Sequence, residues 1–328
     1  MKITPPLLGF GSPLLDMLAH VPESFVAELP GGKGGMMEVD AEWHRDIISR
    51  LPGEPFSAPG GSAGNTVFAL ARLGVPCSML GKLNNDSAGL LYRQLFVEKG
   101  GDDSCFVVGG ERPTGRCLSL VTPDGERTMR TDLGASTELT ADEAAGIDFS
   151  RFGCVLLEGY MLFNAPAFDQ VCRSAKAAGC VVAMDLASYE VVNIFREKLD
   201  FVLKEYVDIV FANRDEAKAF APECTAPAEQ LARLREYCNT AVVKLGAAGA
   251  MISAEDAGTI IIPAEKVENV CDTTAAGDLW QAGFLGGLLK GMALYDAGKL
   301  GAKLSGEVVK VLGSVLPEEV WCGITGDL

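Results

Sequence analysis

Histidine and paired cysteines are scarce in this sequence of 328 residues. The chain has two histidines, His20 and His44, and no CxxC pair among its ten cysteines. The chain therefore has few candidate residues for a Ser-His-Asp triad or for a metal site with histidine ligands. Several cysteines, among them Cys154 and Cys180, lie within apolar runs, which is typical of reduced core cysteines in a reducing compartment. We accordingly expect a cytoplasmic protein.

Positive charge and long apolar runs are also in short supply. Lysine and arginine total 28 against 44 aspartates and glutamates, which gives a formal net charge of −16. Because proteins bind nucleic acids mainly by neutralising phosphates with lysine and arginine, we expect no nucleic-acid partner. No run reaches the roughly 18 apolar residues that a membrane helix needs. Prolines in the N-terminal MKITPPLLGF interrupt the apolar helix of a signal peptide, so we expect no membrane partner.

Two common nucleotide-binding signatures are missing. GGKGGM at residues 31–36 has neither the spacing of a P-loop nor its hydroxyl residue. GFGSPL at residues 9–14 has only two of the three glycines of the dinucleotide fingerprint. The sequence therefore argues against a P-loop enzyme and against a Rossmann dehydrogenase.

Short apolar runs alternate with helical patterns from about residue 60 onward. Each run is followed by polar residues or glycine and then by a helical pattern, which is typical of strands buried on both faces of a sheet. We predict an α/β fold with a central, mostly parallel sheet between two helical layers and right-handed crossovers. The five runs are residues 77–83, 153–159, 181–186, 208–213 and 241–246.

Two segments depart from this alternation. Residues 16–40, approximately, have the pattern of short strands joined by a glycine-rich loop. Residues 103–131 alternate and carry a turn at Pro123, Asp124 and Gly125, which predicts a hairpin. We predict that both segments belong to a small β lid inserted into the α/β core of a single domain spanning residues 1–328.

Polar residues follow several of the predicted strands at the point where each strand ends. Asp185, Asn213 and Lys244 come after apolar runs, and Gly246 and Gly249 follow Lys244. In an open parallel sheet, ligands bind at the carboxyl ends of the strands. A single polar residue at the end of a strand is common in turns and would not indicate a site. Several such residues at the ends of neighbouring strands predict a ligand-binding cleft.

The stretch DTTAAGDLW, residues 272–280, places small residues between two aspartates, just before a helical pattern. We predict that the helix begins near residues 275–277, where its first N–H groups have no intrahelical partner and carry a partial positive charge. Without bulky side chains around them, these N–H groups can surround phosphate oxygens, and Asp278 can act on whatever attacks that phosphate. The alternative is that Asp272 or Asp278 only stabilises the helix N-terminus.

A second glycine cluster, GGSAGNT at residues 60–66, precedes another helical pattern. It also leaves bare backbone at the start of a helix, and the side chain of Asn65 can both donate and accept hydrogen bonds. The alternative is a tight turn with an asparagine cap.

Together, these stretches resemble the PfkB/ribokinase family of carbohydrate and nucleoside kinases. GGSAGNTVFALARLG is similar to the N-terminal signature of the family and DTTAAGDLWQAGFL to its C-terminal signature, about 210 residues later. NRDE at residues 213–216 is similar to the Asn-x-x-Glu motif, and KLGAAG at residues 244–249 to the loop that lies along ATP. Many members have glycine at Ala275, although ribokinases also carry Ala-Ala-Gly-Asp. The resemblance implies a ribokinase-like three-layer sandwich with a small β lid.

The N-terminal part resembles one branch of this family. GFGSPLLDMLAHV, residues 9–21, is similar to the start of adenosine-kinase-like members, and GERTMRTDLGAS, residues 125–136, resembles the same branch. The resemblance implies an ATP-dependent kinase that transfers the γ-phosphate to the primary hydroxyl of an adenosine-like ribonucleoside. A free-sugar kinase of the ribokinase or fructokinase type is the alternative. A catalytically silent binding protein is a third reading, which the intact Asp278 argues against.

The resemblance also implies roles for individual residues. Asp278 would take the proton of the acceptor hydroxyl, and the N–H groups of Ala275, Ala276 and Gly277 would stabilise the developing charge. Arg127 or Arg130 would reach the γ-phosphate from the lid. The alternative, equally open for each, is a solvent-exposed charge on the hairpin with no role in the site. The sugar would be held by Asp16, Gly60, Gly61 and Asn65. An apolar slot for a base has four candidates, each equally a core candidate: Leu14, Met36, Tyr160 and Met161. ATP would be bound by Asn213, Lys244, Gly246, Gly249 and Thr273.

Cofactors and partners follow from the same resemblance. It implies ATP and Mg²⁺, with the metal held mainly through water and phosphate near Glu216. A monovalent cation site near Asp272 occurs in some relatives, and the residues do not decide whether one is present. The partner is a small-molecule sugar or nucleoside. An exposed edge of the lid sheet could pair between subunits, so the sequence allows a monomer or a homodimer.

Overall fold

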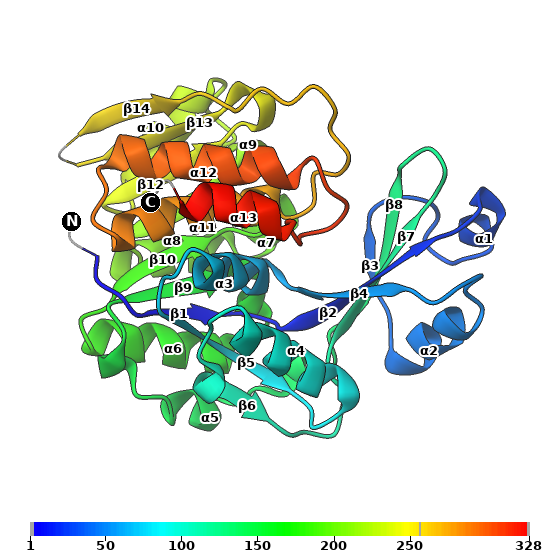
Figure 1. Cartoon of the computed structure of the whole chain (residues 1–328). Coiled ribbons are helices and arrows are strands. Elements are labelled where there is room, and N and C mark those ends of the chain that lie inside the picture. Colours follow the sequence, from blue (N-terminus) through cyan, green and yellow to red (C-terminus); the bar gives the residue numbers. More distant parts are fainter. Residues whose placement is uncertain (1–2, 256, 327–328) are drawn as a thin grey trace.

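The computed structural model describes residues 3–255 and 257–326 and has two parts, a large α/β body and a small β lid (Figure 1). Nine strands form the body sheet, in the spatial order β14-β13-β12-β11-β10-β9-β1-β5-β6. Neighbours from β6 to β12 are parallel, whereas β12, β13 and β14 pair antiparallel at one edge. The strands are β1 (Leu7–Phe10), β5 (Cys77–Leu83), β6 (Phe106–Val108), β9 (Cys154–Glu158), β10 (Val181–Asp185), β11 (Ile209–Asn213), β12 (Thr240–Lys244), β13 (Ala250–Ala254) and β14 (Gly258–Ile262).

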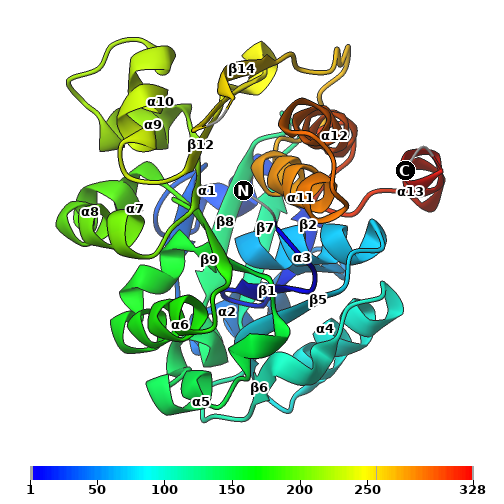
Figure 2. The same cartoon turned by 90° about the vertical axis from the view of Figure 1, so that its left-hand side faces the viewer.

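Helices cover both faces of this sheet, as the apolar runs predicted (Figure 2). The sheet has an apolar core on each face, and successive strand residues pack into opposite cores. Leu156, for example, packs into the core on one face and Leu157 into the core on the other. One layer consists of α3 (Ser62–Arg72), α4 (Ser87–Glu98), α11 (Ala276–Leu289), α12 (Leu294–Val308) and α13 (Glu318–Thr325). The other consists of α5 (Ala141–Ala145), α6 (Ala165–Ala177), α7 (Tyr189–Ile194), α8 (Arg196–Glu205), α9 (Arg214–Phe220) and α10 (Pro227–Arg235). Short 3₁₀ turns are η1 (Asp103–Cys105), η2 (Gly134–Glu138), η3 (Phe149–Arg151), η4 (Gly159–Phe163) and η5 (Gly246–Ala248).

The lid is a separate five-stranded sheet with the order β3-β8-β7-β2-β4. Its elements are β2 (Leu14–His20), α1 (Glu23–Ala27), β3 (Met36–Glu38), α2 (Ala41–Ser49), β4 (Phe56–Gly60), β7 (Arg116–Val121) and β8 (Arg127–Asp132). The antiparallel pairing of β7 with β8 confirms the hairpin predicted around residues 123–125. Residues from α1 and α2 pack with those of β2 and β7 in a small apolar core, which leaves the other face of the lid sheet toward the body.

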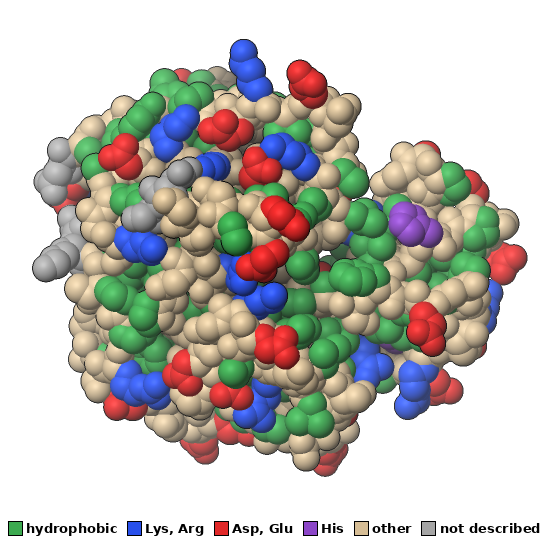
Figure 3. All heavy atoms as spheres, viewed as in Figure 1, with side chains coloured by type: hydrophobic (Ala, Val, Ile, Leu, Met, Phe, Trp, Pro, Cys, Tyr) green, Lys and Arg blue, Asp and Glu red, His purple; other side chains and the backbone are tan. Residues whose placement is uncertain are grey.

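The lid boundaries differ from the prediction in two places. Residues 106–108 form β6, which pairs with β5 in the body, so the lid begins only at Arg116 in that part of the chain. Residues 41–60 also belong to the lid, because α2 covers its sheet and β4 pairs with β2. Figure 3 shows the lid and the body meeting at a surface rich in hydrophobic side chains, with a hollow between them.

The helix that follows the DTTAAGDLW stretch packs unusually closely on its neighbour. A Cβ atom at Gly283 of α11 would lie 2.6 Å from the backbone nitrogen of Gly301 in α12, and one at Gly287 would lie 2.8 Å from the Cα atom of Ala297. Only glycine permits this backbone contact, which fixes the position of α11 in the body.

Within residues 3–255 and 257–326, no helix has both the length and the apolar character that crossing a bilayer requires.

Candidate active site

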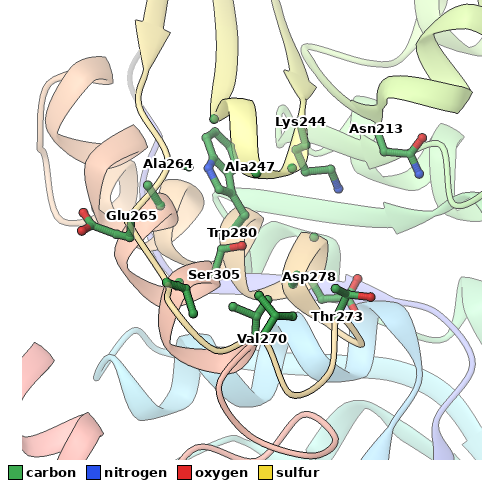
Figure 4. A pocket seen from close by; sticks show the side chains of 18 of the residues that line it. Asn213, Lys244, Ala247, Ala264, Glu265, Val270, Thr273, Asp278, Trp280 and Ser305 are labelled. Carbon is green, nitrogen blue, oxygen red and sulfur yellow. The ribbon is translucent and has the colours of Figure 1, made fainter. Parts of the chain in front are cut away.

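A cavity of about 600 Å³ opens at the carboxyl edge of the body sheet. It lies where parallel sheets bind ligands, between the ends of β10, β11 and β12, the first turn of α11 and the loop that precedes α11. Figure 4 shows Lys244, Thr273 and Asp278 on one side of it and Ala264 and Ser305 on the other. The small-residue stretch therefore faces a cavity and is not covered by other side chains.

The first turn of α11 presents backbone to this cavity. The helix begins at Ala276, within the predicted range, and both Ala276 and Gly277 line the cavity. Ala275, at the N-cap, has a left-handed φ of 59° and no side chain that could cap the helix. This conformation costs an alanine about 1–2 kcal/mol, and strain of this kind is characteristic of functional sites. The N–H of Ala276 makes only a long bond of 3.3 Å, to the carbonyl of Thr273.

The carboxylate of Asp278 is held in place by the start of helix α3. Ser62 Oγ donates to Oδ1 at 2.9 Å and Asn65 Nδ2 donates to Oδ2 at 2.9 Å. Burial raises the pKa of Asp278 to about 6, with a further increase from Asp185, while the hydrogen bonds from Asn65 and Ser62 and the charge of Lys244 oppose the shift. Asp278 is thus ionised near pH 7 and can accept a proton, while its pKa is far closer to neutrality than that of an ordinary aspartate.

Two glycines allow close contacts where strand β4 of the lid leads into helix α3 of the body. Gly60 ends β4, and a Cβ atom there would lie 2.3 Å from the carboxyl carbon of Asp16 on β2. Gly61 is the N-cap of α3 with a φ of 86°, and a Cβ atom there would lie 2.2 Å from the carbonyl oxygen of Ser12. The GGSAGNT stretch is thus a strand-to-helix junction that brings Asp16, Asn65 and Asp278 together.

Asp16 is a second carboxyl group with an unusual pKa. Burial raises its pKa to about 7, and the charge of Asp278 adds to the shift, while Arg127 opposes it. Asp16 and Arg127 both line a small cleft between the lid and the segment Leu312–Val315. The polar groups of the lid therefore face the body across this cleft.

Arg127 on β8 links the lid to the loop before α11. Its guanidinium forms an ion pair with Asp272 at 3.1 Å and a hydrogen bond with Thr274 Oγ1, and both charged side chains are largely buried. Asp272 also accepts hydrogen bonds from the N–H of Thr274 at 3.0 Å and from the N–H of Gly313 at 2.7 Å. The loop of the C-terminal motif is therefore ordered partly by a residue from the lid.

Arg130 lies on the opposite face of the lid sheet. Because side chains alternate along a strand, residues 127 and 130 point to opposite faces. The Arg130 guanidinium is buried and donates to the carbonyl oxygens of Pro30 at 2.7 Å, Gly32 at 2.8 Å and Met129 at 2.9 Å. This corrects the expectation that either arginine could reach a phosphate, since Arg130 belongs to the core side of the lid.

The four candidates for an apolar slot are placed differently. Tyr160, in η4 directly after β9, lines the cavity. Met161 is buried and its sulfur accepts a hydrogen bond from Ser12 Oγ at 3.4 Å, which is a core position. Leu14 begins β2 and packs against Gly115, while Met36 is 55% exposed on the edge strand β3. Only Tyr160 of the four borders the cavity in this structure.

The ends of β10 and β12 contribute an ion pair to the cavity. Lys244 Nζ donates to Asp185 Oδ2 at 2.8 Å, and both side chains are largely buried. Burial disfavours the charged form of Lys244, but the carboxylates of Asp185, Glu216 and Asp278 outweigh it and raise the pKa of the lysine. Gly246 and Gly249, which follow Lys244, line the same cavity with left-handed φ values of 61° and 88°.

Asn213 and Glu216 form the start of α9 beside this pair. Asn213 is the N-cap, its Oδ1 accepts the N–H of Glu216 at 2.9 Å, and Glu216 Oε2 accepts the N–H of Asn213 at 2.7 Å. Burial and the charge of Asp185 raise the pKa of Glu216 to about 7, with Lys244 opposing. The NRDE motif thus combines a reciprocal helix cap with an acid at the cavity.

One buried acid, Glu158 at the end of β9, was missed by sequence reasoning. Its Oε2 accepts the N–H of Ala63 at 2.9 Å, and a Cβ atom at Gly11 would lie 2.4 Å from the same oxygen. Burial raises its pKa to about 8, with hydrogen bonds from the backbone of Ala63 and Ser12 opposing and the charges of Asp278 and Asp185 adding to the shift. The sequence did offer a signal for Glu158, because this acid ends an apolar run in the same way as Asp185 does.

The sequence pattern of the pfkB family carbohydrate kinases matches residues 38–321 of this chain. The chain is 27% identical to the adenosine kinase of Saccharomyces cerevisiae, over 97% of this chain and 98% of that protein. It is 28% identical to the aminoimidazole riboside kinase of Salmonella typhimurium, over 74% of this chain and 76% of that protein.

Solved structures show the same similarity in three dimensions. The crystal structure of adenosine kinase from Sinorhizobium meliloti superimposes with a TM-score of 0.87 and 31% identity, and the match covers 100% of both chains. A probable sugar kinase from Rhizobium etli superimposes with a TM-score of 0.86 and 29% identity, over 99% of this chain and 98% of that one.

Proposed function

The chain belongs to the pfkB family of carbohydrate kinases, and on that premise we propose that it transfers the γ-phosphate of ATP to the primary hydroxyl of a ribonucleoside. Members of the family are phosphotransferases that act on hydroxyl groups, and this chain has their ribokinase-like fold. One observation carries the proposal: an ionised, positioned carboxylate, Asp278, adjoins the uncovered N-terminus of α11 in a single cavity. The named relatives that phosphorylate ribosides favour a ribonucleoside over a free sugar.

Asp278 is the proposed base. It takes the proton of the acceptor hydroxyl as that oxygen attacks the γ-phosphorus of ATP. The bond from the γ-phosphorus to the oxygen that bridges it to the β-phosphate breaks, and ADP leaves with the electron pair. The N–H groups of Ala275, Ala276 and Gly277 stabilise the charge that develops on the γ-phosphoryl oxygens, as positioning and electrostatics do in phosphoryl transfer generally.

The acceptor would lie between Asp278 and the lid. We propose that Asp16 and Asn65 hold the ribose hydroxyls, because both lie at the junction formed by Gly60 and Gly61. Tyr160 is the proposed contact for the base, since it borders the cavity with an apolar ring. Closure of the lid over the acceptor would exclude water, which otherwise competes for the phosphoryl group.

ATP would occupy the remainder of the cavity. We propose that the loop from Lys244 to Gly249 lies along the nucleotide, with Asn213 and Thr273 near its phosphates, because all of them border the cavity. The absence of bulky side chains at Gly246 and Gly249 leaves the backbone open to the ligand.

The donor groups present fit a magnesium ion that is bound mainly by phosphate and water. Within residues 3–255 and 257–326, no three His, Cys, Asp or Glu side chains are arranged to hold a metal. Mg²⁺ bound to ATP keeps several waters and needs few protein ligands. Glu216 would contact it through water, and the bound ion would neutralise phosphate charge. The mechanism needs no monovalent cation to neutralise Asp272, because Arg127 is already paired with it.

A coupled assay of ADP release tests the acceptor. The acceptors are adenosine, inosine, guanosine, ribose and fructose at equal concentrations, each with ATP and Mg²⁺. We expect the highest kcat/KM with a ribonucleoside and at least about tenfold less with ribose, because a free sugar makes no contact at Tyr160. Turnover confined to the free sugars would replace the proposal with a ribokinase or fructokinase function. We further propose that the enzyme is cytoplasmic and has no macromolecular partner of another kind. We propose that it acts as a monomer or homodimer, and sedimentation of the purified chain would measure this oligomeric state.

A further inference from the structure

We propose that Lys244 hydrogen-bonds the γ-phosphoryl group during transfer, and that Asp185 is a positioning residue that holds the lysine at the N-terminus of α11. This inference rests on the proposed function, because it concerns the same transfer of a phosphoryl group. It goes further in assigning a role to Asp185 and in giving Lys244 a contact with the reacting group.

The place of the ammonium group carries the first part of the proposal. A Cβ atom at Gly277 would lie 3.0 Å from Lys244 Nζ, so the ammonium lies directly against the first turn of α11. Gly277 borders the cavity, and so does Lys244 (Figure 4). A cation at this position adds its charge to the partial positive charge of the helix N-terminus, at the point where phosphate oxygens would lie.

The hydrogen-bonding capacity of Lys244 carries the second part. An ammonium has three donors. Within the part of the chain that the structure describes, Nζ has one hydrogen-bond acceptor, Asp185 Oδ2 at 2.8 Å. The side chain is largely buried and borders the cavity, where a ligand could accept from the other two donors. Two oxygens of a phosphoryl group would satisfy them, and such charge-assisted bonds are about twice as strong as neutral ones.

Asp185 is built to hold the lysine in one place. Its Oδ1 accepts the N–H of Ala187 at 2.7 Å, which leaves Oδ2 for Lys244. Ala187 adopts a left-handed φ of 68°, and it is one of two non-glycine residues with positive φ in the described chain. The other is Ala275, at the start of α11. Strained backbone of this kind therefore occurs on both sides of the proposed phosphoryl position.

During transfer, Lys244 donates hydrogen bonds and keeps its proton. The proton of the acceptor goes to Asp278, and the electron pair of the broken P–O bond leaves with ADP, so Lys244 changes no bond of its own. The competing explanation is that the pair with Asp185 is only a buried salt bridge that contributes to folding. The two explanations predict different nucleotide affinities.

The binding experiment compares two nucleotides in wild type and in Lys244→Met, which keeps the length of the side chain without its charge. Calorimetry would measure the dissociation constants of ADP and of a non-hydrolysable ATP analogue with an imido β–γ bridge, both with Mg²⁺ and without acceptor. We expect the preference for the triphosphate over ADP to fall by at least about tenfold, since one charge-assisted hydrogen bond is lost at minimum. An unchanged preference would overturn the proposal.

Lys82→Met is the matched control. Lys82 also lies near the end of a body strand, is buried, and is paired with an acid, Glu143, at 2.7 Å, but it does not line the cavity. We expect it to lower stability and to leave the preference between the two nucleotides unchanged within about twofold. An equal loss of preference in the control would mean that the effect of Lys244→Met is a general consequence of removing a buried lysine, and would also overturn the proposal.

A pH profile separates the two partners. Lys244 lowers the pKa of Asp278 and Asp185 raises it, in an environment that also contains Glu216. Lys244→Met should therefore move the acidic limb of kcat/KM to higher pH, and Asp185→Asn should move it to lower pH, each with at least about a tenfold loss of kcat. A shift in the opposite direction in either variant would contradict the placement of this pair beside Asp278. Failure of wild type to bind either nucleotide would refute the proposed function itself, whereas an unchanged preference in Lys244→Met would refute only this inference.

Discussion

Replacing Glu158 with glutamine should make the stability of the ligand-free protein less dependent on pH between pH 6 and pH 8. Burial raises the pKa of this carboxyl from its usual value of 4.5 to about 8. In this pH range the folded protein keeps the proton of Glu158 while the unfolded chain has released it. The folded state therefore binds more protons, and its stability falls as the pH rises toward 8.

The size of the effect follows from the number of protons involved. A difference of one proton gives a slope of about 1.4 kcal/mol per pH unit. With a folded pKa of about 8, the contribution of Glu158 should decrease by about 2 kcal/mol from pH 6 to pH 8. Glutamine has no proton to lose, and its carbonyl can still accept the N–H of Ala63. Asp16, Glu216 and Asp278 also have raised pKa values, so only the difference between wild type and variant isolates Glu158.

The assay is urea unfolding of both proteins at intervals from pH 5.5 to pH 8.5, followed by tryptophan fluorescence. Glu229→Gln is the control, because Glu229 also accepts backbone N–H groups, from Ala226 and Thr225, which hold its pKa below the usual value. Its substitution should leave the slope between pH 6 and pH 8 unchanged. Parallel stability curves for wild type and Glu158→Gln would refute the reasoning, since they would mean that folded Glu158 does not hold its proton in this range.

Three further predictions concern the proposed site. Asp278→Asn should lower kcat by at least about a thousandfold while ATP binding persists, because the variant lacks both the base and the charge; near-normal turnover would remove Asp278 as the base. Arg127→Met should lower kcat/KM for the acceptor by at least about tenfold, with a greater loss below pH 7, because Arg127 opposes the raised pKa of Asp16 and pairs with Asp272; a pH-independent rate equal to wild type would contradict this. Ala275→Gly should raise the Tm by about 2 °C with activity retained, since glycine adopts the φ of 59° without strain; Ala276→Gly, inside the helix, should lower it.

Most of the body could be predicted from the sequence because its strands are buried on both faces. β5, β9, β10, β11 and β12 each lie within one of the five apolar runs or differ from it by one residue. β13 and the edge strand β14 leave most of their residues half-buried or exposed, so they lack the buried apolar run on which the other strand predictions depended. In the lid, β4 contains Pro59, which is unusual within a strand, whereas α2 is an amphipathic helix whose pattern the prediction overlooked.

The candidate site was predictable where small residues and polar residues recur at the starts of helices. Both glycine-containing stretches lie at one cavity because the topology brings the N-termini of α3 and α11 together, which periodicity alone does not reveal. Strand alternation could have shown that Arg127 and Arg130 point to opposite faces, but which face is covered depends on α1 and α2. Glu158 and Asp185 each end an apolar run, which marks both positions in the sequence. The contact of Glu158 with the N–H of Ala63 joins residues 95 positions apart, and a single sequence carries no signal for it.

The glycine contacts between α11 and α12 have a consequence for how such an enzyme can diversify. They hold helix α11 against the body, whereas Asp16 and Gly60 lie on strands of the lid. Mutations that change which alcohol is recognised can therefore accumulate on β2 and β4 while the residues proposed to bind the nucleotide remain unchanged. Over generations, new acceptor preferences would arise in the smaller part of the molecule, at little risk to the chemistry of the larger one.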